Sequence, residues 1–189
     1  MARETDVPRT MLLELLKEHA LKRGDFTLKS GRKSNFLINC KDVVLTADGH
    51  YFVGRVMLET LQTAGCKAVA GVELGGCPIA SAIAMASSVT DKPINAVYVR
   101  KSPKDHGSKN LLEGEAFVKR TDPIVVVEDV TTTGSSALDA VIQLWKYGYS
   151  VMGVATLVDR LEGGRENIVS KNLTFWSVFD RNDFLPSGE

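Results

Sequence analysis

Residues 123–136 read Pro-Ile-Val-Val-Val-Glu-Asp-Val-Thr-Thr-Thr-Gly-Ser-Ser. A continuous apolar run, residues 124–127, leads into two carboxylates and then into a hydroxyl-rich turn that opens a helical pattern. Backbone N–H groups at the start of a helix, together with the local dipole, attract a phosphate, and Gly134 allows the backbone to approach it closely. The segment therefore predicts a buried strand followed by a phosphate-binding turn.

The two carboxylates of this segment, Glu128 and Asp129, come directly before the turn. They would repel a phosphate if they pointed at it, so we expect them to accept hydrogen bonds from vicinal sugar hydroxyls or to lie near a divalent cation. The alternative is a solvated acidic turn that caps an ordinary helix. A cap needs one hydroxyl, whereas this turn offers Thr131, Thr132, Thr133, Ser135 and Ser136.

The composition limits the classes of partner. The 189 residues are enough for one domain with its own core. The 23 basic and 23 acidic residues cancel, which argues against a nucleic-acid partner. The three cysteines lack a Cys-x-x-Cys pair, which indicates reduced thiols and neither a disulfide framework nor a zinc site. Without a signal sequence or an apolar run near the roughly 18 residues of a membrane helix, we expect a cytoplasmic protein with no membrane partner.

The order of hydrophobic patterns predicts the fold class. Continuous apolar strands that alternate with helices are typical of an α/β fold with a mostly parallel central sheet flanked by helices. We interpret residues 1–189 as a single domain, with a small N-terminal hood over about 1–45 and a core over about 46–189. The expected helices are 8–23, 47–64, 78–89, 135–147 and 161–170, and the expected strands are 36–40, 67–72, 94–99, 124–127, 150–158 and 173–179.

A glycine pair, Gly75 and Gly76, follows the strand predicted at 67–72. Glycines at such a turn let successive backbone N–H groups point inward, which makes an anion-binding concavity suited to a diphosphate. A plain strand-to-helix turn is the alternative. Since ligands of parallel sheets bind beyond the carboxyl ends of the strands, this loop and the 123–136 turn are expected on the same edge.

Residues 100–114 form a basic, glycine-punctuated stretch that contains Arg100, Lys101, Lys104 and His106. Such a loop could close over a highly charged diphosphate, neutralise it as it leaves and exclude water. The alternative is a solvated basic loop without function.

Three segments of the sequence resemble motifs of known enzyme families. Residues 123–136 are similar to the signature of type I phosphoribosyltransferases, which use phosphoribosyl pyrophosphate. The order Arg-Lys-x-x-Lys-Asp-His-Gly at 100–107 looks like the catalytic loop of the orotate-specific family, and Phe-x-Leu-x-Ser-Gly-x-x-Ser at 26–34 resembles its pyrimidine-pocket element. The resemblance implies the type I phosphoribosyltransferase fold, phosphoribosyl transfer to orotate in pyrimidine synthesis, Mg²⁺ as cofactor, and a homodimer with shared active sites.

The resemblance also implies roles for individual residues. Lys101, Lys104 and His106 would meet pyrophosphate oxygens, often in the neighbouring subunit's site, and Asp105 would handle a proton. Mg²⁺ would be held mainly by substrate and water, near Asp129. The implied substrate-binding residues are Lys29, Phe36 and Arg160 for the base end, Glu128 and Asp129 for the ribose, Thr131, Thr132, Thr133, Gly134, Ser135 and Ser136 for the 5-phosphate, and Gly75, Gly76 and Arg100 for the diphosphate.

Two other functions fit part of the sequence. One is a noncatalytic regulator that senses phosphoribosyl pyrophosphate and binds nucleic acid, but about 25 residues precede the pocket element, too few for a winged helix. The other is a transferase for a purine or for uracil, which would not require Lys29, the basic loop and Arg160 together. His19 and His50 have no metal-ligand spacing and are interpreted as structural.

Overall fold

A six-stranded sheet with the order β5-β4-β3-β6-β7-β8 forms the centre of the molecule. The computed structural model describes residues 6–27, 33–102 and 110–185. β5 (Leu112–Glu113) is antiparallel to its neighbour, and the other strands run parallel to one another. These are β3 (Ala68–Val72), β4 (Asn95–Val99), β6 (Pro123–Thr131), β7 (Ser150–Asp159) and β8 (Thr174–Asp180).

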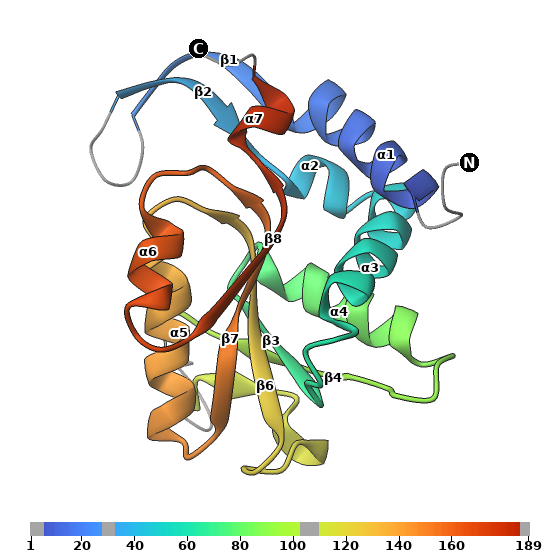
Figure 1. Ribbon diagram of the computed structural model, residues 1–189, viewed down its shortest axis with the longest axis vertical. Helices are drawn as coiled ribbons and strands as arrows, with labels where there is room; N and C mark the ends of the chain where they lie inside the picture. Colours follow the sequence, from blue (N-terminus) through green and yellow to red (C-terminus); the bar gives the residue numbers. More distant parts are fainter. Residues whose placement is uncertain (1–5, 28–32, 103–109, 186–189) are drawn as a thin grey trace.

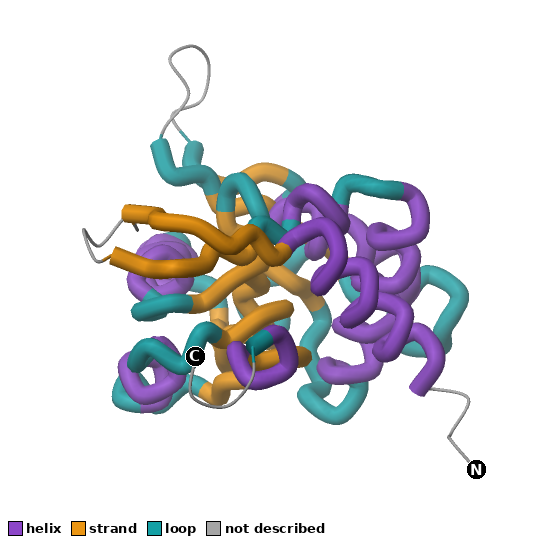
Figure 2. The backbone as a smooth tube through the Cα atoms, turned by 90° about the horizontal axis from the view of Figure 1, so that it is seen from above, coloured by secondary structure: helices purple, strands orange, loops and turns teal. Residues whose placement is uncertain are grey.

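Helices cover both faces of this sheet (Figures 1 and 2). α3 (Ala47–Leu61) and α4 (Gly76–Ser87) lie on one side, and α5 (Ser135–Lys146) and α6 (Gly164–Val169) lie on the other. Successive residues of a strand point to opposite faces, so Val125 and Val127 pack into the first layer while Val126 packs into the second. The predicted α/β fold with a mostly parallel, helix-flanked sheet is confirmed.

The N-terminal segment differs from the prediction of one helix over 8–23. α1 (Asp6–Leu15) continues as a π-helical turn, Leu16–Ala20, and the chain then becomes strand β1 (Leu21–Thr27). β1 pairs antiparallel with β2 (Lys33–Ile38), with an irregularity between Arg23 and Phe26 where Gly24 adopts φ 152°. The polar residues of β1 carry no strand pattern, because pairing with β2 and not local preference makes this segment extended.

This β1–β2 hairpin lies at the end of the sheet where the parallel strands finish, beside α7 (Arg181–Phe184) (Figure 1). The short helix α2 (Lys41–Val44) follows the hairpin, and the thiol of Cys40 donates to the backbone oxygen of Asp129 at 3.9 Å. The hairpin segment is therefore joined to the end of β6. No helix in residues 6–27, 33–102 and 110–185 is both long and apolar enough to cross a membrane.

Candidate active site

A cleft of about 660 Å³ opens beyond the carboxyl ends of the parallel strands, between them and the hairpin. It collects residues from the segments that follow β3, β4 and β7 as well as from β6 and the turn after it. Of the residues predicted from the sequence, the cleft is lined by Gly75, Lys101, Glu128, Asp129, Thr132, Thr133, Gly134, Ser135, Ser136 and Arg160.

The acidic pair belongs to β6 itself. The predicted strand, 124–127, was too short and placed the pair after the strand. β6 continues because its pairing with β7 extends to the partners Thr131 and Asp159. Asp129 is mostly enclosed, with 16% of its side chain exposed, and its Oδ2 lies 3.5 Å from Nζ of Lys41. Its Oδ1 accepts a hydrogen bond from the N–H of Val130 at 3.0 Å. These contacts hold one carboxylate in a fixed position on the floor of the cleft.

The turn after β6 presents the start of α5 to the cleft. Gly134 precedes α5 with φ 77°, and the structure shows no side-chain hydrogen bond capping this helix. The first N–H groups of any helix lack intrahelical acceptors, and here the residues at the helix start, Gly134, Ser135 and Ser136, line the cleft. An ordinary helix cap, the alternative for this segment, would have filled that role with a side chain. The helix start instead offers donors and a positive dipole end for an anion.

Two of the predicted residues lie under the cleft instead of lining it. The side chain of Thr131 is 1% exposed, and a Cβ on Gly164 would lie 2.4 Å from its Cγ2. A Cβ on Gly76 would lie 2.2 Å from the backbone oxygen of Val127, so this glycine lets α4 approach β6. Packing restricts both positions, and their predicted roles in ligand binding stay predictions.

The first two residues of the basic segment, Arg100 and Lys101, share one cavity, and only Lys101 also lines the cleft. Lys101 lines the cleft, and its backbone N–H donates to Oε2 of Glu73 at 2.8 Å. Arg100 lines a neighbouring cavity of about 370 Å³ that shares Lys101 and Ser136 with the cleft. Nη1 of Arg100 lies 3.9 Å from Oε1 of Glu113. The predicted site residues Lys29, Lys104, Asp105 and His106 lie outside the described residues.

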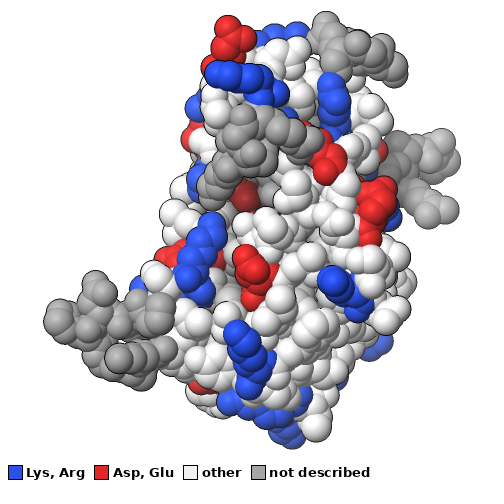
Figure 3. Space-filling model, turned by 90° about the vertical axis from the view of Figure 1, so that its left-hand side faces the viewer, with Lys and Arg blue, Asp and Glu red and all other residues white. Residues whose placement is uncertain are grey.

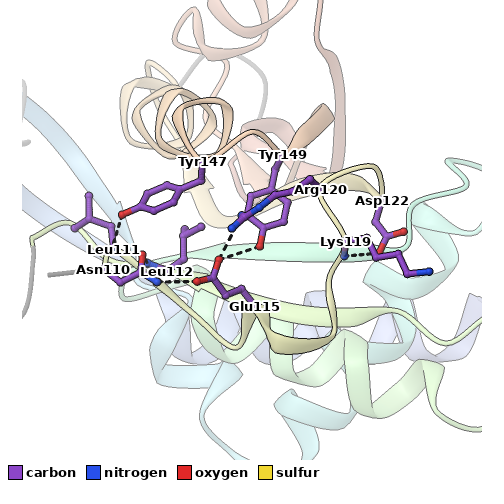
Figure 4. Close-up of polar contacts among 9 residues, drawn as sticks. All are labelled: Asn110, Leu111, Leu112, Glu115, Lys119, Arg120, Asp122, Tyr147 and Tyr149. Atoms are coloured by element: carbon purple, nitrogen blue, oxygen red, sulfur yellow. Dashed lines mark hydrogen bonds and ion pairs between the residues drawn. The ribbon is translucent and has the colours of Figure 1, made fainter. Parts of the chain in front are cut away.

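A polar network holds the chain where the basic segment rejoins the sheet (Figure 4). Glu115 is its centre: Oε1 accepts from Nδ2 of Asn110 at 2.8 Å, and Oε2 accepts from the hydroxyl of Tyr149 at 2.9 Å and lies 3.4 Å from Nη1 of Arg120. Burial, followed by the bond to Glu115, raises the pKa of Tyr149. The network ties the strand edge at Leu112 to the start of β7.

A cavity of about 750 Å³ adjoins the cleft, and the two share Phe26 and Arg160. Arg160 is 3% exposed; its Nε lies 2.8 Å from Oε1 of Glu162, and its Nη2 donates to Oγ of Ser34 at 3.2 Å. Its guanidinium lies 4.3 Å from the ring centroid of Phe36, a cation–π distance. The predicted residues Phe36 and Arg160 are thus in contact.

Burial and charge tune two further groups near the site. Burial, with the nearby Glu73 carboxylate, raises the pKa of the Cys77 thiol to about 11. This thiol is therefore protonated at neutral pH and is not an activated nucleophile. Burial also raises the pKa of Asp159, whose Oδ1 accepts from the N–H of Leu161 at 2.9 Å and so shapes the turn that carries Arg160.

Among the residues that line these cavities and that sequence reasoning missed are Lys41, Glu73 and Arg181. Arg181 had a readable signal, because Asp180–Arg181 repeats the Asp159–Arg160 pair at the end of the next strand. Lys41 had none, since it is a charged residue in a segment with no motif. Glu73 lies beside the Gly75–Gly76 pair, but the anion-binding role predicted there gave no reason to expect a carboxylate.

Comparison with known proteins gives consistent neighbours. No protein-family model matches the chain. The orotate phosphoribosyltransferase of Sorangium cellulosum is 49% identical over 179 residues, which cover 94% of this chain and 93% of that protein. The Synechocystis enzyme of the same name is 46% identical over 93% of this chain and 87% of its own. The crystal structure of Mycobacterium tuberculosis orotate phosphoribosyltransferase with 5-phospho-alpha-D-ribosyl 1-diphosphate superposes with a TM-score of 0.76 at 34% identity, covering 94% of this chain and 98% of that one.

Proposed function

The chain belongs to the orotate phosphoribosyltransferase family, and from this premise we propose that the cleft beyond β3 and β6 is where phosphoribosyl pyrophosphate and orotate meet. The enzyme transfers the phosphoribosyl group to orotate and releases pyrophosphate and orotidine 5-phosphate. The observation that carries the proposed location is that one cleft holds an acidic pair, an uncapped helix start and a buried arginine.

In the proposed arrangement, the 5-phosphate lies at the start of α5, where unpaired N–H groups and the hydroxyls of Thr132 and Thr133 donate to it. Glu128 and Asp129 accept from the ribose hydroxyls and fix the ring, which orients the anomeric carbon between the leaving diphosphate and the base. Positive charge develops at that carbon while negative charge builds on the diphosphate. Lys101, at the rim of the cleft, stabilises the leaving group.

We propose Mg²⁺ as the cofactor because the donor set fits it. Glu128 and Asp129 offer hard carboxylate oxygens in the cleft, while the described ranges contain no cluster of three or more His, Cys, Asp or Glu side chains. Such a site suits an ion that keeps several waters and takes its other ligands from a diphosphate. When bound, the ion supplies charge neutralisation to the diphosphate.

A homodimer with shared sites is a further proposal, and it is supported by the family resemblance. Mixing Lys101→Ala subunits with Asp129→Ala subunits tests it. If Lys101 serves the neighbouring subunit, a mixed dimer has one complete site and activity returns; if it serves its own subunit, the mixture stays inactive. A single species of monomer mass in sedimentation would contradict the dimer itself.

A cytoplasmic location is also a proposal. It is supported by the three cysteines, which are buried and unpaired, as is usual in reducing compartments. Cell fractionation with an antibody against the protein tests it.

Ultraviolet absorbance provides the decisive assay of the activity. The purified protein is mixed with phosphoribosyl pyrophosphate, Mg²⁺ and orotate, with uracil, hypoxanthine and adenine in parallel. Of the four bases, we expect only orotate to be turned over, and we expect this turnover to stop when a chelator is added. Saturable binding of phosphoribosyl pyrophosphate without turnover of any base would instead favour a sensor.

A further inference from the structure

The ends of two neighbouring strands carry the same pair of residues. β7 ends in Val158, Asp159 and then Arg160, and β8 ends in Phe179, Asp180 and then Arg181. The two strands are parallel, and their register pairs Val158 with Phe179 and Asp159 with Asp180. Arg160 and Arg181 therefore leave the sheet at the same level, side by side.

Both arginines reach the same aromatic ring. The guanidinium carbon of Arg160 lies 4.3 Å from the centroid of Phe36, and that of Arg181 lies 5.4 Å from it. Both side chains line the cavity of about 750 Å³ that adjoins the cleft. Two guanidinium groups thus converge on one wall of this cavity.

The backbone around Arg181 is fixed by a reciprocal cap. The side chain of Asp180 accepts from the N–H of Asn182 at 2.7 Å, and the side chain of Asp183 accepts from the N–H of Asp180 at 2.9 Å. This capping box starts α7 at Arg181. The guanidinium is therefore carried by a preorganised helix start and not by a loose terminal segment.

Among the described residues that line the cavity, cations outnumber anions by one. Its ionisable lining residues are three cations, Lys33, Arg160 and Arg181, and two anions, Asp25 and Glu162. Glu162 lies 2.8 Å from Nε of Arg160, so this buried pair is neutral as a unit. This balance of charges among the described lining residues favours a base that carries a carboxylate over a neutral pyrimidine.

We propose that Arg181 is a specificity-determining residue that binds the carboxylate of orotate and so favours orotate over an uncharged pyrimidine. A planar guanidinium matches a carboxylate with two parallel N–H donors, which a lysine cannot reproduce. The inference rests on the proposed location of the base at this end of the cleft.

The test compares Arg181→Gln and Arg181→Lys with the control Arg165→Gln, which removes a guanidinium from another ring, 4.8 Å from the centroid of Phe175. KM for orotate, KM for phosphoribosyl pyrophosphate and kcat are measured, with calorimetric binding of orotate and of uracil. For Arg181→Gln we expect KM for orotate to rise tenfold or more, about the loss of a charge-assisted hydrogen bond, while KM for phosphoribosyl pyrophosphate and uracil binding stay within about twofold. KM for orotate in Arg181→Lys should lie between the values of the wild type and of Arg181→Gln. Arg165→Gln should have the KM values and kcat of the wild type.

Two outcomes overturn this inference without touching the proposed function: an unchanged KM for orotate in Arg181→Gln, or equal losses of orotate, uracil and phosphoribosyl pyrophosphate binding, which would show a structural role. A wild-type protein that turns over no orotate would overturn the proposed function itself and this assignment with it. Thermal melting of each variant separates misfolding from a lost contact, and Arg181→Lys keeps the test decisive if Arg181→Gln does not fold.

Discussion

The carboxylate of Asp129 occupies the space that a side chain on Gly75 would need: a Cβ built on Gly75 would lie 2.3 Å from Cγ of Asp129. Gly75 precedes α4, and Asp129 comes from β6. The loop proposed for the diphosphate and the carboxylate proposed for the ribose are therefore in van der Waals contact. A side chain at position 75 would displace this carboxylate, because the three atoms nearest to a Cβ there all belong to the Asp129 side chain.

We accordingly expect Gly75→Ala to lower kcat/KM by roughly a hundredfold, the cost of a misplacement near 1 Å. Thermal stability should change little, because the Asp129 side chain can rotate away from the new methyl group. Steady-state kinetics and thermal melting measure the two effects. In an Asp129→Ala background the same substitution should cost no further activity; an additional hundredfold loss there would contradict the contact as the cause.

Lys101→Ala should reduce kcat by at least about two orders of magnitude, as for other groups that stabilise developing charge. The fold should persist, since the side chain is exposed and only the backbone N–H of Lys101 bonds to Glu73. The matched control is Lys119→Ala, another exposed lysine. A variant with wild-type turnover would remove Lys101 from the mechanism.

Glu115→Gln tests the network at the edge of the sheet. It keeps the shape of the side chain but removes the charge that faces Arg120 and accepts from Tyr149, so we expect the free energy of unfolding to fall by about 1–3 kcal/mol. Urea denaturation measures the loss. A double-mutant cycle with Tyr149→Phe should show coupling between the two positions; strictly additive losses would mean that their hydrogen bond contributes nothing.

Asp159→Asn should change how stability depends on pH. Burial raises the pKa of Asp159 in the folded protein, so the charged form opposes folding at neutral pH and this penalty disappears as pH falls through the raised pKa. The asparagine variant keeps an oxygen acceptor for the N–H of Leu161 and lacks the penalty. We expect it to be at least as stable as the wild type at pH 7, with its advantage shrinking toward acid pH. Urea denaturation across that range checks the sign, and a variant that is less stable at pH 7 than at pH 4, relative to the wild type, would contradict it.

The features that could be predicted from the sequence are those that depend on residues close together along the chain. The apolar run of β6 and its hydroxyl turn indicated both a strand and a ligand site, and the structure places the acidic pair, the start of α5 and Lys101 around one cleft. The functional roles of these residues remain predictions. Patterns of this kind survive folding because a buried parallel strand has to be apolar on both faces.

What the sequence could not predict depends on contacts between distant segments. β1 is extended because β2 pairs with it, although its own residues are polar. The strand β6 extends past the acidic pair because β7 continues beside it. Thr131, at the end of β6, and Gly76, at the start of α4, are packed against other segments, and no spacing along the chain shows which neighbours meet the end of a strand or the start of a helix.

Phe26 and Arg160 mark the boundary between the cleft and the 750 Å³ cavity. The proposed sites for the donor and for the base therefore depend on different strands. In the proposed arrangement, β6 and its turn bind the sugar phosphate, whereas the ends of β7 and β8 bind the base. Protein engineering can use this division. Exchanging the ends of β7 and β8 together with the β1–β2 hairpin would change the acceptor base, while the residues that bind the donor stay the same. Evolution has the same freedom, so within this scaffold a new nucleobase preference requires no new phosphate site.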